Sequence, residues 1–176
     1  MIILGIHDGH NASACLIVDG KLVCALGEER LSRDKHQYGF PARAIETVLE
    51  AGGIGIGDVD RIAMATATLP PAYFYTARNS TLTIKDYWKE QKEYWYPKLY
   101  EGKDSKYMEI FAEKINRDNF PYDESFIDHE RDHEGMWRAR LDHLCRTLGV
   151  EEDIISVHDH HESHAAGAYY TSPFTE

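Results

Sequence analysis

The sequence predicts an α/β fold in which helices cover a mixed β-sheet. Four short runs rich in apolar and β-branched residues predict strands: 2–7, 14–18, 21–26 and 61–66. A tight-turn dipeptide separates the second run from the third, and a helical pattern separates the third from the fourth. Three strands in a meander, then a helix and another strand, indicate a mixed sheet with helices packed on it.

The composition limits the class of protein. The chain has 176 residues, of which 19 are basic and 30 acidic, giving a net charge of −11. This length suits one domain with a real core. The acidic excess argues against a nucleic-acid partner. No apolar run approaches the roughly 18 residues of a membrane span, and the N-terminus lacks signal-peptide features, so we expect a cytoplasmic protein with no membrane contact.

The first two predicted strands are joined by a loop at residues 8–12, and the second hairpin turns at Asp19-Gly20. This turn would place Cys15 directly opposite Cys24. In a cytosolic chain, such a pair is expected to be two reduced core residues rather than a disulfide.

A helix is expected to begin at Pro41 and end near Gly52, with Ile45, Val48 and Leu49 along its buried face. Several glycines follow between 52 and 57. They come after a helix and before a strand, which is the reverse of the order in a dinucleotide-binding loop. We therefore interpret them as a flexible connection.

Residues 70–130 form an inserted segment that is dense in tyrosine and tryptophan. Helical spacing predicts that two sets of residues each share a buried face: Ile84, Tyr87, Trp88 and Trp95, then Met108, Phe111, Ala112 and Ile115. One interpretation is a helical pair that packs its aromatic side chains. The other is an acceptor-binding lid whose rings stack on a sugar.

Regular structure is expected again after residue 132. Helical spacing predicts a helix that ends at Gly149. Its apolar positions are Trp137, Leu141, Leu144, Cys145 and Leu148. A short strand is expected at 154–157, followed by a helix that begins near His160.

The end of the chain carries a dense histidine cluster. In a helix, His160 and His164 are i and i+4 neighbours on the same face, and two imidazoles so placed can share a transition-metal ion. The pattern is His-x-Glu-x-His, and further ligands must come from elsewhere. The alternative is a group of solvated or hydrogen-bonded histidines. A position just after a strand favours the metal site.

A second group of polar residues lies between the first two strands. Backbone N–H groups and a hydroxyl there could hold a phosphate, and His10 could act as a general base. The alternative is a polar hairpin that caps its own backbone. The candidate residues are Asp8, Gly9, His10, Asn11 and Ser13.

A third group follows the third predicted strand. Arg33, Lys35 and His36 gather where that strand ends, and they could bind an anionic group. A solvated charged surface is the alternative.

Three motifs in this order resemble the N-terminal domain of the carbamoyltransferase family, which includes nodulation proteins and antibiotic O-carbamoyltransferases. They are Gly-His-Asn-Ala-Ser-Ala at 9–14, Gly-Glu-Glu-Arg-Leu-Ser-Arg-Asp-Lys-His at 27–36 followed by Phe40-Pro41, and Asp-His-His-Glu-Ser-His-Ala-Ala at 159–166. The run Tyr-Tyr-Thr-Ser-Pro-Phe at 169–174 is also similar. His-x-Glu-x-His is similar, too, to the metal motif of tRNA threonylcarbamoyl-transfer proteins.

The resemblance implies the first lobe of an actin-like ATPase (ribonuclease H-like) fold, spanning 1–176 with the insertion at about 70–130. It implies a divalent metal, with iron favoured, and ATP as the source of a carbamoyl-adenylate. The implied partners are small molecules: carbamoyl phosphate, ATP and a hydroxyl acceptor such as a sugar or natural product. The resemblance is compatible with a homodimer and does not fix the oligomeric state.

By position, the resemblance makes His160 and His164 metal ligands and His10 the catalytic histidine. It places Asp8, Gly9, Asn11 and Ser13 near the nucleotide. It places Arg33, Lys35 and His36 near the donor or acceptor.

Asn11 stands where the family often has aspartate, which weakens the assignment of His10 as a base. The family's remaining metal ligands, second phosphate loop and YrdC-like domain correspond to positions beyond 176. We therefore expect this fragment alone to bind metal weakly and to be inactive. Two alternative functions are a tRNA threonylcarbamoyl-transfer-like protein and a non-catalytic metal- or nucleotide-binding module.

Overall fold

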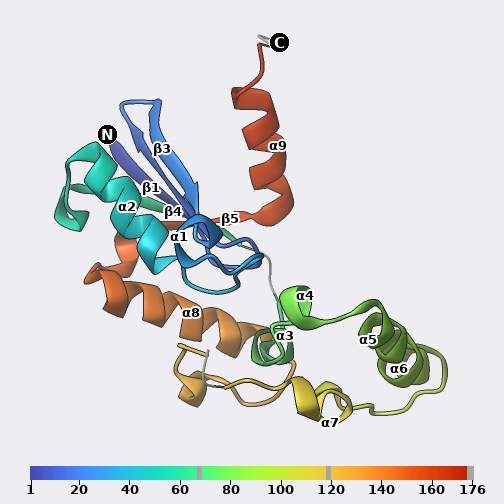
Figure 1. The fold of residues 1–176 in the computed structure, drawn as a ribbon. Coiled ribbons are helices and arrows are strands. Elements are labelled where there is room, and N and C mark those ends of the chain that lie inside the picture. Colours follow the sequence, from blue (N-terminus) through green and yellow to red (C-terminus); the bar gives the residue numbers. More distant parts are fainter. Residues whose placement is uncertain (67–68, 118–119, 174–176) are drawn as a thin grey trace. The chain divides into compact units, whose positions relative to one another are not determined.

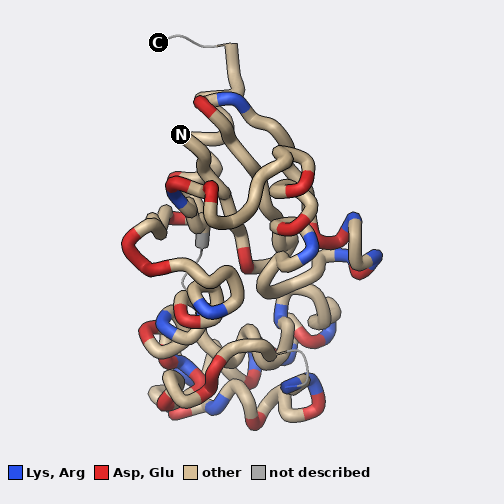
Figure 2. Tube along the Cα trace, turned by 90° about the vertical axis from the view of Figure 1, so that its left-hand side faces the viewer, with Lys and Arg blue, Asp and Glu red and all other residues tan. Residues whose placement is uncertain are grey.

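The computed structural model describes residues 1–66, 69–117 and 120–173 (Figure 1). The chain divides into two compact units: Met1–Ala67 with Cys145–Glu176, and Thr68–Leu144. Lys and Arg are interspersed with Asp and Glu along the chain (Figure 2). Among the described residues, no helix is long and apolar enough to cross a membrane.

The first unit is built on a five-stranded mixed sheet in the order β3-β2-β1-β4-β5. The strands are β1 (Ile2–His7), β2 (Ser13–Val18), β3 (Lys21–Gly27), β4 (Arg61–Thr66) and β5 (Ile155–Asp159). The β1–β2 and β2–β3 pairs are antiparallel, whereas β4 runs parallel to both β1 and β5. The α/β class and the mixed sheet are confirmed.

The β2–β3 hairpin turns at Asp19 and Gly20, which both have positive φ, as the turn type requires. The expected pairing of the two cysteines is wrong by one position. Cys15 lies opposite Ala25, and Cys24 lies opposite Leu16, because an irregularity after Leu16 shifts the register. All three cysteines lie in the part of the chain that the structure describes, and none of them forms a disulfide.

A helix covers β2 and β3 on one face of the sheet. Helix α2 (Ala42–Gly52) buries Ala44, Ile45, Val48 and Leu49, which confirms the predicted face. Its N-terminus is held by Glu28, whose buried carboxylate accepts the N–H groups of Arg43 and Ala44 at 3.3 and 2.7 Å. A side chain between strand and helix therefore supplies the cap that Pro41 cannot.

The chain returns to the first unit for its last strand and helix. Helix α9 (His160–Tyr170) begins directly after β5 (Figure 1). The Asp159 side chain accepts the N–H groups of His161 and Glu162, which caps the helix. Phe174, the last residue of the terminal motif, lies outside the described residues.

The second unit is made of short helices joined by loops. They are α3 (Pro71–Tyr75), α4 (Arg78–Thr81), α5 (Ile84–Lys89), a π-helical turn at Glu90–Trp95, α6 (Tyr96–Tyr100), α7 (Tyr107–Ile110) and α8 (His133–Leu148), the last of which continues into the first unit. The remaining short segments are α1 (Glu29–Ser32) and 3₁₀ turns at Ile56–Asp58, Ala112–Lys114, Glu124–Phe126 and Glu152–Ile154. A core forms from Ala72, Tyr94, Tyr107 and Phe111.

The predicted buried face of the first aromatic helix is wrong. Ile84 and Trp88 are 79% and 63% exposed, whereas Glu90 and Tyr94 are buried. The π-helical turn adds a residue to the repeat, so a 3.6-residue period does not carry through it. Glu90 is buried because Arg78 contacts both its carboxylate oxygens, at 2.8 and 2.7 Å.

The other two predicted helical faces are partly right. In the second aromatic set Phe111 is buried, but Ala112 is exposed and α7 has only four residues. In α8 Leu144 is buried as expected. The other buried positions of α8 are Gly135, Met136, Ala139 and Arg140.

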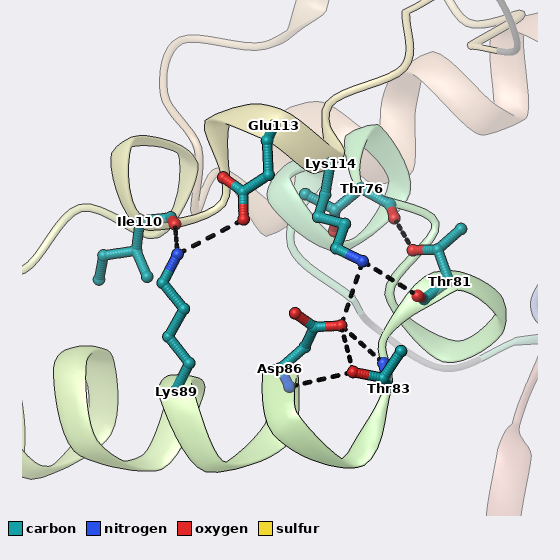
Figure 3. Close-up of polar contacts among 8 residues, drawn as sticks. All are labelled: Thr76, Thr81, Thr83, Asp86, Lys89, Ile110, Glu113 and Lys114. Atoms are coloured by element: carbon teal, nitrogen blue, oxygen red, sulfur yellow. Dashed lines mark hydrogen bonds and ion pairs between the residues drawn. The ribbon is translucent and has the colours of Figure 1, made fainter.

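Polar contacts fix the start of α5 (Figure 3). Asp86 accepts from the amide and hydroxyl of Thr83 and pairs with Lys114 at 3.1 Å. Lys89 donates to the carbonyl of Ile110 at 2.6 Å and reaches Glu113. These contacts tie α5 to the segment around α7 within the second unit.

Candidate active site

Three parallel strands end at the same edge of the sheet in the first unit. His7 ends β1, Thr66 ends β4 and Asp159 ends β5. The β1–β2 loop and the first turn of α9 therefore meet at the carboxyl edge, where α/β sheets commonly bind ligands.

A cavity of about 330 Å³ lies at this edge. It joins five of the predicted site residues from opposite ends of the chain: His10, Asn11, Ser13, His160 and His164. The lining residues are His7, His10, Asn11, Ser13, Ala65, His160, Ser163 and His164.

The two histidines of α9 converge. The Nε2 atoms of His160 and His164 are 3.2 Å apart. Two metal–nitrogen bonds of about 2.0–2.1 Å at a tetrahedral angle would separate their nitrogens by about 3.3 Å, so this pair suits a shared cation. The described residues contain no group of three or more histidine, cysteine, aspartate or glutamate side chains that could hold a metal. The pair could therefore supply two ligands, and a complete metal site would need further ligands from elsewhere.

The surroundings of His160 favour the form of this imidazole that can bind a metal. Burial, and then the neighbouring His164 and His7, lower the pKa of His160 below its ordinary value. The neutral ring is the one that offers a nitrogen lone pair to a cation. Asp159 accepts the N–H groups of His161 and Glu162 and so fixes where the helix that carries both rings begins.

His7 is a part of the site that the sequence did not reveal. Its Nδ1 lies 2.8 Å from the carbonyl oxygen of Ala65, and its Nε2 lies 3.0 Å from that of His10. Its ring centroid is 5.5 Å from that of His160. Since both nitrogens face carbonyl groups, His7 holds the β1–β2 loop against β4 rather than offering a free nitrogen. A histidine that ends a strand gives no local signal of this role.

His10 faces the pocket from the loop. Its ring centroid is 6.4 Å from that of His160, and the side chain is only half-buried. Burial, followed by His7 and His36, lowers the pKa of His10. A neutral, accessible imidazole is the state that a general base needs.

Two of the expected ligand-binding residues are buried within the β1–β2 loop. Asp8 is 1% exposed, and Gly9 is buried at a position where an added Cβ would lie only 2.9 Å from the His7 ring. Neither lines the cavity, whereas Asn11 and Ser13 do.

The basic group after β3 is only partly joined to the site. The Nδ1 atom of His36 lies 2.9 Å from Oδ1 of Asn11, and the His36 amide donates to Glu29. Arg33 and Lys35 are exposed and do not line the cavity. His36 is therefore the member that contacts the loop.

Comparisons with known proteins agree with this arrangement of motifs. The family described as Carbamoyltransferase N-terminus matches residues 2–176. The nodulation protein NolNO of Sinorhizobium fredii is 43% identical over 54 residues, which are 31% of this chain and 8% of that protein.

Two uncharacterised proteins are also similar. One, from Methanocaldococcus jannaschii, is 41% identical over 66 residues, which are 34% of this chain and 13% of that protein. The other, from Synechocystis, is 27% identical over 169 residues, which are 95% of this chain and 22% of that protein. The chain thus spans less than a quarter of the length of each of these three relatives.

Proposed function

The chain belongs to the carbamoyltransferase family, and from this premise we propose that the complete protein transfers a carbamoyl group to the hydroxyl of a sugar or natural product. The carbamoyl group would come from carbamoyl phosphate by way of a carbamoyl-adenylate. One observation carries the proposal: His10, His160 and His164 line one cavity at the carboxyl edge of the sheet.

The strand order supports an actin-like ATPase lobe. Three antiparallel strands are followed by two that add in parallel on the other side of β1. This is the sheet expected for a ribonuclease H-like lobe, in which nucleotides bind at the carboxyl edge.

The cavity has room beside it for a nucleotide. A larger apolar groove of about 650 Å³ lies along the sheet and shares four residues with the histidine pocket: His7, Ser13, Ala65 and Ser163. Apolar walls suit a base, and the hydroxyl of Ser13 and the amide of Asn11 suit phosphate oxygens. Arg33 and Lys35 stay candidates for the donor or acceptor.

In the transfer step the acceptor oxygen forms a bond to the carbamoyl carbon, and the bond from that carbon to the adenylate oxygen breaks. AMP leaves with the bonding electrons. His10 would take the proton of the acceptor hydroxyl, and its lowered pKa keeps it unprotonated and ready to do so. His7 would hold the loop that carries His10.

A divalent metal would be held by His160 and His164, with further ligands from outside the described residues. Iron is the favoured metal. When bound, it would supply positive charge that polarises an oxygen of the donor.

The experiment separates the two half-reactions in the complete protein. His10→Ala is expected to abolish carbamoyl transfer to the acceptor and to leave carbamoyl-adenylate formation from ATP and carbamoyl phosphate intact. His129→Ala, an exposed histidine of the second unit, is the matched control. Loss of both half-reactions together in His10→Ala would contradict the proposed role.

A further inference from the structure

The second unit contains a cavity of its own. It has a volume of about 210 Å³, and every residue that lines it belongs to Thr68–Leu144. The lining residues are Leu69, Pro70, Ala72, Tyr73, Tyr94, Trp95, Tyr107, Glu130, Arg131 and His133. Four aromatic rings and three ionisable side chains therefore share a small space.

The aromatic rings form a rigid wall. Tyr94 and Tyr107 are buried, with ring centroids 5.1 Å apart. Tyr73 packs on Tyr107 at 5.2 Å, and Trp95 packs on Tyr94 at 4.9 Å. Because Tyr73 and Trp95 are only half-buried, these two rings remain accessible to a ligand.

An ion pair between Arg78 and the buried Glu90 contacts one of these rings. The Arg78 guanidinium lies 4.7 Å from the Tyr73 ring centroid and binds both oxygens of Glu90. Burial, and then the charge of Glu90, raise the pKa of Tyr107. Its phenol is therefore a neutral hydrogen-bonding group inside the unit.

The other side of the cavity is polar. Glu130 is held in place because its two oxygens accept the N–H groups of Tyr107 and Met108, at 2.7 and 2.8 Å. A carboxylate has about four lone-pair sites, so each oxygen can accept another hydrogen bond. Arg131 and His133 are exposed and offer donors beside it.

We propose that this cavity binds a single neutral sugar ring. The C–H face of a pyranose would stack on Trp95 or Tyr73, and its hydroxyls would donate to Glu130 and accept from Arg131. Opposite charges on the rim favour a neutral polyhydroxyl ligand, which both donates and accepts, over an anion or a cation. The volume is below the roughly 300–1,000 Å³ of sites for drug-sized ligands, which suits one ring.

This proposal does not rest on the proposed carbamoyl transfer, because it concerns binding in the other unit. The second unit also supplies an internal control. Trp88 is an exposed tryptophan on α5 that does not line the cavity. A surface that binds sugars through any exposed aromatic ring would involve Trp88 as much as Trp95.

Binding is measured on the complete protein by saturation-transfer NMR with methyl glucoside, methyl galactoside and methyl N-acetylglucosaminide. We expect at least one to bind with a millimolar Kd. Trp95→Leu and Arg131→Ala should each weaken that binding at least about fivefold, whereas Trp88→Leu and Arg138→Ala should leave it unchanged. Thermal midpoints are compared for all four variants to show that each is folded. If Trp95→Leu does not fold, Arg131→Ala alone tests the proposal, because Arg131 is exposed and its removal is not expected to unfold the protein.

Three results would overturn the proposal. They are no saturation transfer to any of the three glycosides at 10 mM, equal losses in Trp88→Leu and Trp95→Leu, and displacement of the glycoside by adenosine, which would mark a site for flat aromatic ligands. None of these results bears on carbamoyl-adenylate formation, so failure here is distinguishable from failure of the proposed function.

Discussion

The Nε2 atoms of His160 and His164 lie 3.2 Å apart on successive turns of α9. The helix sets this separation, and the Asp159 cap fixes where the helix begins. The two nitrogens that we propose as metal ligands are therefore already oriented towards each other, which would lower the entropy lost on binding a cation.

His164→Ala in the complete protein is expected to lower metal affinity by at least about 100-fold, since it removes one of the two converging nitrogens. Bound metal is measured by elemental analysis after dialysis against iron. His161→Ala is the control, because this neighbouring histidine does not line the cavity. Equal loss of bound metal in both variants would contradict a site formed by the His160–His164 pair.

The 176-residue chain by itself is expected to bind ferrous iron weakly and to show no turnover. Two imidazoles do not complete a coordination sphere of four or more ligands. Isothermal titration of the chain with ferrous iron checks this. A tight site with one iron per chain would contradict it.

Glu28→Ala is expected to destabilise the first unit by about 2–3 kcal/mol, because the N–H groups of Arg43 and Ala44 lose their buried acceptor. Glu28→Gln keeps one acceptor oxygen and should lose about 1 kcal/mol. Urea unfolding measures both. Glu46→Ala, on the exposed side of α2, is the control and should change little.

The ionisation of Asp86 makes the free energy of unfolding depend on pH in the acid range. Hydrogen bonds from Thr83 and the ammonium group of Lys114 lower the pKa of Asp86 to about 2. Because the folded pKa lies below the ordinary value of 3.8, the stabilisation is present above pH 3.8 and is lost as the pH falls towards 2.

Asp86→Asn should therefore reduce the steepness with which the unfolding free energy falls between pH 4 and pH 2. The measurement is urea unfolding at a series of pH values. Glu93→Gln, an exposed carboxylate on the same helical segment, is the control. An unchanged slope in Asp86→Asn would rule out this contribution.

Gly135→Ala is expected to destabilise the second unit by about 3 kcal/mol, because its Cβ would overlap the backbone carbonyl of Phe126. A carbonyl in the backbone cannot turn aside as a side chain can. Gly167→Ala in α9 meets no atom within 4 Å and should leave the thermal midpoint unchanged or slightly raised. Similar losses of stability in both variants would mean that the loss does not come from the close contact with the Phe126 carbonyl.

The strands, the hairpin and α2 could be predicted from sequence because each depends on local patterns. The Asp19-Gly20 turn and the apolar face around Val48 need no distant partner. The cysteine register could not be predicted, because the irregularity after Leu16 leaves no mark in composition.

The second unit was harder to predict for a related reason. A buried glutamate is unfavourable alone, and Glu90 is stable only because Arg78, twelve residues earlier, contacts it. In the site, His10, His160 and His164 were found from motifs. His7 was missed because its partners, the carbonyl of Ala65 and the ring of His160, are close only in the folded sheet.

Because residues from both ends of the chain line this pocket, it can form only late in synthesis. The ribosome adds His7 and His10 roughly 150 residues before His160, which at about 5–20 residues per second is on the order of ten seconds. Until β5 is made and pairs with β4, the first loop has no imidazole opposite it. Nascent chains that stop short of residue 164 therefore lack the histidine pair, and the pocket cannot form until this segment has left the exit tunnel.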